Sequence, residues 1–359
     1  MKNIALIVLV VSLFFPFRKQ NNFLNQRKIT IVEIEPIIND STLNVRAISV
    51  LNEDGCLFVS SDGRLGSIIN VGAHSDYTKA NNYITEFPLT LSHNGEVLNF
   101  RSMALVANAI FVLTIDSPAL LYKISEGKHK LVYQEEGEGV FYDSMDFWND
   151  FEGIAIGDSI DGCLSIIITR DGGETWNKLS CDILPKSKEG EGAFAASDTN
   201  IAIVGNKTWV GTTAGRIYYS KDKGMTWEII ETPIVKEKET EGIYSLAFYD
   251  DLNGFAIGGD YTKPADSTAN KLRTNDGGKT WQLVAQNQSP GYRSCVQYIP
   301  NSEGKELVAV GFKGIDYSKD SGNSWNHLSD EGFYTIRFLN DNTAFAAGNR
   351  RISKLTFKE

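Results

Sequence analysis

The sequence TRDGGETW at Thr169–Trp176 belongs to a pattern, (S/T)-x-D-x-G-x-(S/T)-W, that occurs four times in the chain. The other copies are SKDKGMTW at Ser220–Trp227, TNDGGKTW at Thr274–Trp281 and SKDSGNSW at Ser318–Trp325. Successive tryptophans are 51, 54 and 44 residues apart, which is about the length of a four-stranded repeat unit. This recurrence predicts a repeat architecture built from small sheets.

The residues of this octet favour a tight turn between two strands. The aspartate can accept hydrogen bonds from backbone N–H groups across the turn, and the glycine supplies the positive φ that a short hairpin requires. The tryptophan is large and apolar enough to pack between neighbouring units. We therefore expect the four aspartates to be turn residues rather than catalytic groups or metal ligands. They are Asp171, Asp222, Asp276 and Asp320.

Two further elements repeat with the octets. One is a short apolar strand that ends in glycine: GIAIGD at Gly153–Asp158, GFAIGG at Gly254–Gly259, LVAVG at Leu307–Gly311 and AFAAG at Ala344–Gly348. The other precedes it, at Val45–Ile48, Phe100–Met103, Tyr142–Met145, Ile243–Leu246, Tyr292–Cys295 and Phe333–Ile336. Alternating β-rich runs without helical periodicity predict an all-β chain. A further unit fits around Ala193–Ser197, so we expect seven units, the first two without an octet.

The octets resemble the Asp-box, or BNR, repeat over roughly residues 130–330. The overall pattern is similar to the Asp-box propellers typified by photosystem II assembly factors and to their exported bacterial relatives, and more distantly to the sialidases. This resemblance implies a β-propeller with the octets on its rim, and the count of seven units predicts seven blades. We expect Lys28–Glu35 (KITIVEIE) to pair beside Arg351–Phe357 and complete the last blade, because closure would remove an exposed sheet edge.

The N-terminus is expected to lie outside this domain. A short charged start is followed by an apolar stretch of twelve residues, Ile4–Phe15, which is typical of a secretory signal and short for a membrane span. We assign residues 1–17 to a signal peptide, 18–27 to a polar tether and 28–359 to one propeller domain. A periplasmic or secreted protein follows, or a membrane-anchored one if the signal is not cleaved.

Composition excludes several kinds of partner. The formal net charge of −10 disfavours nucleic acid and anionic membrane surfaces. The four histidines are isolated, no Cys/His spacing predicts a metal site, and no glycine-rich string opens a helix as a nucleotide loop would. We therefore expect no metal and no cofactor. Because a closed propeller has no need to oligomerise, we expect a monomer.

The candidate site comes from the first strand of each unit, which lines the channel of a propeller. Equivalent positions there are Arg46, Arg101, Asp143, Tyr244, Arg293 and Tyr334, with Phe194 as the less certain member from the fourth unit. Three guanidinium groups in one ring would bind a carboxylate or phosphate. The alternative is that the acids of the entering loops neutralise the arginines; these acids are Glu138, Glu191, Glu241 and Glu331.

The leading hypothesis is an exported propeller that binds an anionic small molecule, a glycan or a protein partner at this arginine-lined face. The alternative is a sialidase-like exo-glycosidase. The resemblance would then assign Arg46, Arg101 and Arg293 to a substrate clamp, Tyr244 or Tyr334 to the nucleophile and Asp143 to the acid/base. The absence of the sialidase Arg-Ile-Pro segment disfavours this alternative.

The cysteines of an exported chain raise a separate question. If Thr169 pairs with Thr175 across the first octet, Cys163 lies opposite Cys181, and a cross-strand disulfide fits. Buried free thiols are the alternative, because a shift of one residue in register would separate them. Cys56 and Cys295 belong to different units and are expected to be free.

Overall fold

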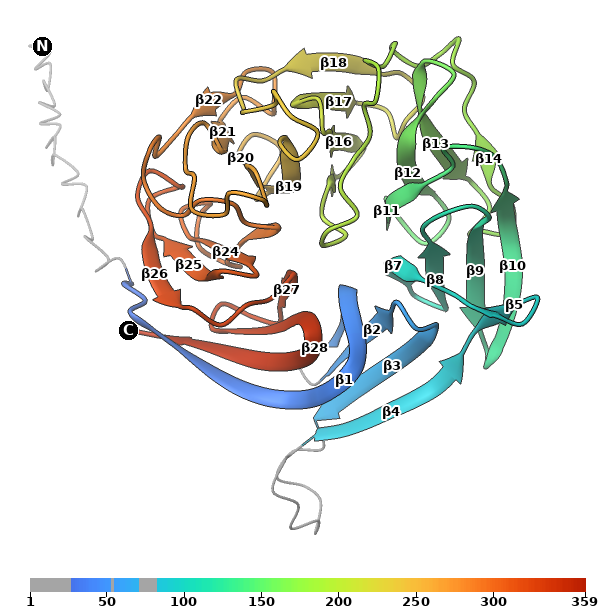
Figure 1. The fold of residues 1–359 in the computed structure, drawn as a ribbon, viewed down its shortest axis with the longest axis horizontal. Coiled ribbons are helices and arrows are strands. Elements are labelled where there is room, and N and C mark those ends of the chain that lie inside the picture. The colour runs from blue at the N-terminus through green and yellow to red at the C-terminus, as the bar shows by residue number, and fades with distance from the viewer. Residues whose placement is uncertain (1–26, 53–54, 71–82) are drawn as a thin grey trace, which may run out of the picture.

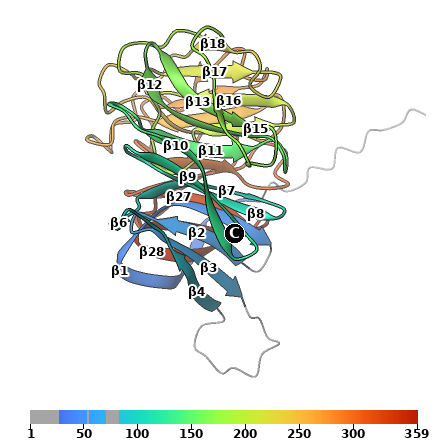
Figure 2. The ribbon, with the colours of Figure 1, turned by 90° about the vertical axis from the view of Figure 1, so that its right-hand side faces the viewer.

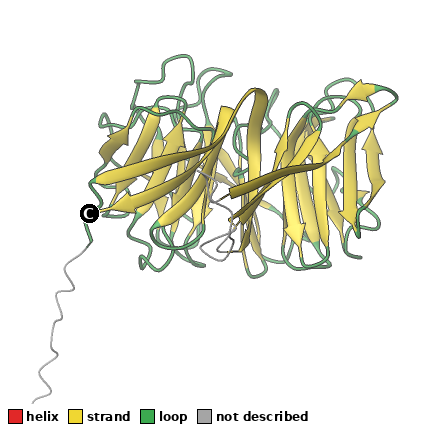
Figure 3. Cartoon of the chain, turned by 90° about the horizontal axis from the view of Figure 1, so that it is seen from below, coloured by secondary structure: helices red, strands yellow, loops and turns green. Residues whose placement is uncertain are grey.

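The computed structural model describes residues 27–52, 55–70 and 83–359 as strands and connecting loops (Figure 1). The expected signal peptide and all of the expected tether except Arg27 lie outside the described residues. Among the described residues, no helix is long and apolar enough to cross a membrane. The sheets form a ring in Figure 1, and the side views show a slab with loops on both faces (Figures 2 and 3).

Five sheets of the ring have four antiparallel strands each. The first contains β7 (Phe100–Val106), β8 (Ala109–Thr114), β9 (Ala119–Ser125) and β10 (Lys128–Glu135). The second contains β11 (Tyr142–Phe147), β12 (Gly153–Ile160), β13 (Cys163–Thr169) and β14 (Asn177–Lys178). The third contains β15 (Ile201–Val204), β16 (Lys207–Gly211), β17 (Arg216–Ser220) and β18 (Glu228–Glu231). The fourth contains β19 (Ile243–Phe248), β20 (Gly254–Gly258), β21 (Lys271–Thr274) and β22 (Gln282–Leu283). The fifth contains β23 (Cys295–Tyr298), β24 (Leu307–Gly311), β25 (Gly314–Ser318) and β26 (Asn326–Ser329).

The sixth sheet joins the two ends of the chain. Its order is β27 (Thr335–Phe338), β28 (Thr343–Lys358), β1 (Ile31–Asn52), β2 (Gly55–Ser60), β3 (Arg64–Asn70) and β4 (Tyr83–Thr90). A small hairpin of β5 (Ser92–His93) and β6 (Glu96–Val97) follows β4. The described chain is thus an all-β propeller with six blades.

The prediction of seven separate blades is wrong, and β1 supplies the reason. This strand pairs with β28 from Ile31 to Asn44 and with β2 from Val45 to Asn52. The first and last units of the chain are therefore hydrogen-bonded into one sheet. The N-terminal residues belong to a strand shared by these two units instead of forming the fourth strand of a separate blade.

The core lies between neighbouring sheets, and the strand GIAIGD shows how the sequence places it there. Side chains alternate along a strand, so Ala155 faces one neighbouring sheet and Ile154 and Ile156 face the other. Ala155 packs in a cluster with Phe111 of β8, whereas the two isoleucines pack with Val210 of β16 and with other residues of the third sheet. Both faces of the strand are buried, which explains its continuous apolar sequence.

Each octet forms the same turn on the outer part of its sheet. Asp171 accepts hydrogen bonds from the backbone N–H of Thr175 (3.0 Å) and from its hydroxyl (2.6 Å), while the Thr169 hydroxyl accepts from Gly173 N–H (2.9 Å). Asp222, Asp276 and Asp320 accept the equivalent pair of hydrogen bonds. Trp176 contacts Phe111 of the preceding sheet, so this octet also joins two blades.

Cys163 and Cys181 form a disulfide with a Cα–Cα distance of 5.5 Å, whereas Cys56 and Cys295 are buried free thiols. The register beside the disulfide is shifted by one residue from the expected one, because Ile168 pairs with Asn177. Regular pairing with β14 ends at Lys178, three residues before Cys181. The bridge therefore does not require the two cysteines to be direct partners in the ladder.

Candidate functional site

Four residues of the predicted channel column stand at β-bulges. The pairing of β1 with β2 shifts between Val45 and Ala47, at Arg46. Equivalent shifts occur at Arg101 in β7, Asp143 in β11 and Tyr244 in β19. A bulge places one extra residue in a strand and changes the direction of its side chain. The repeated sequence thus produces the same local distortion in four sheets.

The glycines of the repeated apolar strands leave space for the backbone of the neighbouring first strand at these bulges. A Cβ atom on Gly157 would lie 2.1 Å from the carbonyl oxygen of Phe141, and one on Gly258 would lie 1.8 Å from that of Gly242. Any side chain at either position would push the first strand away from the second. Gly157 and Gly258 therefore position the residues of the channel column in their sheets.

A segment that crosses the channel completes the site. Residues Ala193–Asn200, which we call the channel segment, lie between β14 and β15 and contain no strand. They form the yellow-green loop that reaches the centre of the ring in Figure 1. Asp198 accepts hydrogen bonds from the backbone N–H of Met103 (3.1 Å), and the carbonyl of Ser197 accepts one from Thr335 (2.9 Å). The assignment of Ala193–Ser197 to a first strand is therefore wrong.

The channel segment forms one wall of a pocket of about 450 Å³. Five predicted residues line this pocket: Arg46, Arg101, Phe194, Tyr244 and Tyr334. Sequence reasoning missed its other side-chain walls, which are Phe141, Asp158, Tyr261, Tyr292 and Phe312. The ring of Phe194 stacks on Tyr244 with 3.6 Å between centroids, so Phe194 is part of the site although it lies outside a strand.

Arg46 and Arg101 present positive charge without an acidic partner. Their Nη1 atoms donate hydrogen bonds to the carbonyls of Ala196 (3.1 Å) and Ala195 (3.3 Å), and neither guanidinium forms an ion pair with the described residues. The Nε atoms of both arginines are buried and have no hydrogen-bond partner there. Burial and the neighbouring charge of Arg46 lower the pKa of Arg101 to about 10, although Asp116 partly offsets this effect. An anion in the pocket would stabilise both charges.

Arg293 does not belong to this pocket, so the predicted ring of three arginines does not form. Its Nε atom donates a hydrogen bond of 2.6 Å to the buried carboxylate of Asp316, and its Nη1 atom donates one of 2.7 Å to the carbonyl of Tyr292. The preceding residue, Tyr292, lines the pocket instead. The strand β23 begins only at Cys295 and has no bulge at Arg293, which explains the shift by one residue.

The alternative pairing with acids of the entering loops is also wrong for three of the four glutamates. Glu191 forms a buried ion pair with Arg216, Glu241 pairs with Lys238 at 3.2 Å, and Glu331 pairs with Arg351. None of these glutamates reaches Arg46, Arg101 or Arg293. The acids of the loops therefore leave the two pocket arginines free for a ligand.

Both candidate nucleophiles, Tyr244 and Tyr334, line the pocket, but the acid/base assigned to glycoside hydrolysis does not. The Tyr244 hydroxyl donates to the carbonyl of Thr240 (2.9 Å), and burial raises its pKa well above the ordinary value. Asp143 is fully buried and does not line the pocket. Burial and the charge of Asp158 raise the pKa of Asp143, and the backbone of Ala193 offsets only part of this effect.

Asp158 is the carboxylate that does line the pocket. It accepts a hydrogen bond from Ala193 N–H (3.2 Å), and burial raises its pKa to about 6. It directly follows Gly157 at the end of the repeated apolar strand, and this position after the glycine was the available sequence signal. No group of three or more metal-ligating side chains occurs in the described ranges.

Comparisons with known proteins give the fold and no family. No family model matches the chain, and no curated protein matches it in sequence. Among solved structures, "YCF48 bound to D1 peptide" is similar with a TM-score of 0.63 and 14% identity, covering 92% of this chain and 98% of that one. The WD40 β-propeller domain of Doa1 is similar with a TM-score of 0.59 and 12% identity, covering 94% and 98%. Both support a β-propeller.

Proposed function

We propose that the protein is a binding propeller that captures a carboxylate group of a protein partner in the central pocket. The observation that carries this proposal is the pair of half-buried arginines, Arg46 and Arg101, which line the pocket without a carboxylate partner in the described chain. A guanidinium offers parallel N–H donors that match the two oxygens of a carboxylate.

The environment of the arginines favours such a ligand. Attraction between opposite charges is stronger at a half-buried site than at an open surface. The burial that lowers the pKa of both arginines also means that a bound anion would relieve a desolvation cost. Aromatic side chains at the same pocket, including Tyr292 and Phe312, supply apolar contact area for the part of the partner next to its carboxylate.

A polypeptide is the preferred source of the carboxylate. The similar YCF48 structure carries a D1 peptide, which supports peptide binding as an activity of this architecture. The disulfide between Cys163 and Cys181 supports an exported protein, because such bonds persist mainly outside the reducing cytosol. We propose a periplasmic or secreted location on this basis, with a partner that is exposed there.

In the test, short peptides are titrated with the purified full-length protein, and binding is measured by fluorescence anisotropy. One set has a free terminal carboxylate, a second is amidated, and a third is amidated but carries an internal Asp or Glu. Inorganic phosphate and a sugar acid form further arms. We expect the free-carboxylate or the internal-acid set to bind, and the Arg46→Gln, Arg101→Gln double variant to lose at least roughly tenfold in affinity.

An Arg170→Gln variant is the control, because Arg170 pairs with Glu152 (2.9 Å) and does not line the pocket. It should bind as the wild type does. Equal binding of the amidated neutral peptides and the acidic peptides would contradict carboxylate recognition. Binding of the sugar acid alone would move the assignment to a glycan ligand.

A further inference from the structure

Two turns of the same sequence type flank a second hollow of the described chain. They read KEGEG at 188–192 and KETEG at 238–242, and they lie in the segments that lead to β15 and β19. In each turn the second glutamate holds the backbone. Glu191 accepts a hydrogen bond from Lys188 N–H (2.9 Å), and Glu241 accepts one from Lys238 N–H (3.2 Å). The repeated sequence thus gives two equivalent turns.

The second glutamate of each turn, Glu191 or Glu241, has a structural role, and its charge is neutralised within the fold. Glu191 is buried and pairs with Arg216, and its other oxygen accepts a hydrogen bond from Thr212 (2.7 Å). Glu241 is buried beside Lys238. Removing either carboxylate would leave backbone N–H groups of its turn without this acceptor. The two turns are therefore firmly held before any partner binds.

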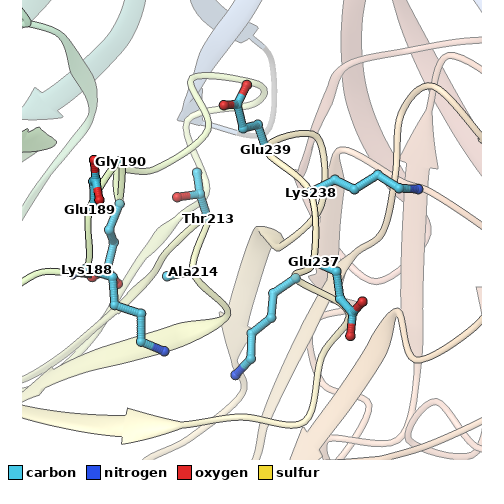
Figure 4. Close-up of a pocket in the computed structure, with 10 residues that line it drawn as sticks. Lys188, Glu189, Gly190, Thr213, Ala214, Glu237, Lys238 and Glu239 are labelled. Carbon is cyan, nitrogen blue, oxygen red and sulfur yellow. Dashed lines mark hydrogen bonds between the residues drawn. The ribbon is translucent and has the colours of Figure 1, made fainter.

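A groove of about 830 Å³ runs between the two turns. Figure 4 shows Lys188 and Glu189 on one side and Glu237 and Glu239 on the other, with Thr213 between them. The groove lies beside the central pocket in the chain as well as in space. Glu191 lines the groove, and Ala193, two residues further on, lines the pocket.

The charge of this groove that is not neutralised by ion pairs is negative. Lys188 and Lys236 both pair with Glu231, at 3.2 and 3.3 Å, and Lys238 pairs with Asp260 at 3.4 Å. By contrast, three exposed glutamates of the groove form no ion pair with the described residues. They are Glu189, Glu237 and Glu239. The net charge of −10 adds a long-range field of the same sign.

We infer that this groove holds a basic stretch of the partner polypeptide. The inference rests on the proposed function, because it takes the carboxylate at Arg46 and Arg101 as the anchor and the groove as the path of the adjoining chain. Lysine or arginine side chains of that stretch would pair with Glu189 of one turn and with Glu237 and Glu239 of the other. The partner would thus combine a carboxylate with a nearby basic segment.

The test compares three labelled Gly/Ser peptides with the same free carboxylate end and with lysine, glutamine or glutamate at three upstream positions. At low salt we expect the lysine peptide to bind the full-length protein roughly three- to tenfold more tightly than the glutamine peptide, and the glutamate peptide to bind most weakly. This preference should shrink as salt is added.

The Glu189→Gln, Glu237→Gln, Glu239→Gln variant should lose the preference and keep its affinity for the glutamine peptide. A matched control carries Glu96→Gln, Glu126→Gln and Glu228→Gln, which changes the net charge equally at exposed positions elsewhere. Equal wild-type binding of the three peptides, or equal loss of preference in the control, would overturn the groove inference alone. No binding of these peptides or of the internal-acid peptides would overturn the proposed function and the groove inference together.

Discussion

The guanidinium of Arg46 lies 4.1 Å from the centre of the Tyr334 ring, on the wall of the central pocket. The two residues come from opposite ends of the chain and meet because β1 and β27 belong to the same sheet. The ring and the carbonyl of Ala196 together hold the guanidinium in place, while no carboxylate of the described chain neutralises it. Tyr334 is therefore a positioning residue for the proposed anion site.

Replacing Tyr334 with Leu should weaken carboxylate binding by about 1 kcal/mol, or roughly fivefold, because the ring no longer orients Arg46. Tyr334→Phe keeps the ring and should bind as the wild type does. Calorimetric titration with an acidic peptide would measure both variants, and thermal melting would show whether each is folded. Equal losses in the Leu and Phe variants would assign the effect to the hydroxyl instead of the ring.

Stability should fall as the pH rises from 5 to 7. Burial raises the pKa of Asp198 to about 7 and that of Asp146 to about 6. A carboxyl whose pKa is raised by folding stabilises the protein below its unfolded pKa, and this contribution is lost as the pH rises from the unfolded value through the folded one. We expect a loss on the order of 3 kcal/mol in the free energy of unfolding. Burial also lowers the pKa of Lys271 to about 7, but that contribution changes only above pH 7.

Urea denaturation at several pH values would measure this slope. Asp146→Asn retains an oxygen that can accept the hydrogen bond from Phe147 N–H (2.7 Å) and removes one titrating group, so its slope should be smaller. Asp182→Asn changes an exposed aspartate and should leave the slope unchanged. A wild-type protein that gains stability between pH 5 and 7 would contradict the prediction.

The sequence was most informative where structure is local. The octets are complete within eight residues, and the hydrogen bonds of Asp171 join residues that are four apart. The sequence indicates that residues 28–35 lie beside residues 351–357, at opposite ends of the chain. It does not indicate that β1 continues into pairing with β2 and so joins the first and last units in one sheet.

The errors at the site have the same physical origin. Arg293 occupies the expected position in the sequence repeat, yet β23 starts later than the other first strands and the buried Asp316 takes its guanidinium. Residues Ala193–Ser197 fit the repeat in sequence, yet they form no strand. The path of this segment is fixed by hydrogen bonds with residues far away in the sequence, such as the bond from Thr335 to the carbonyl of Ser197.

Asp222→Ala should destabilise the protein without changing carboxylate binding. Asp222 accepts hydrogen bonds from the N–H (2.8 Å) and hydroxyl (2.6 Å) of Thr226 and does not line the pocket. Although desolvation raises the pKa of Asp222, the hydrogen bonds from Thr226 outweigh this effect and lower it. We expect a loss of about 1–3 kcal/mol. Asp251→Ala, which removes only an exposed pairing with Lys207, is the control. A loss of binding in the Asp222 variant would contradict a purely structural role.

The disulfide between Cys163 and Cys181 gives a prediction that thiol counting can check. The native protein should show no reactive thiol, because Cys56 and Cys295 are buried. Denaturation without a reductant should expose two thiols, and reduction should expose all four. A Cys163→Ala, Cys181→Ala variant should lose about 2–4 kcal/mol, because its unfolded chain gains freedom that the bridge removes. Four thiols in the denatured, unreduced protein would contradict the bond and remove the main structural support for an exported location.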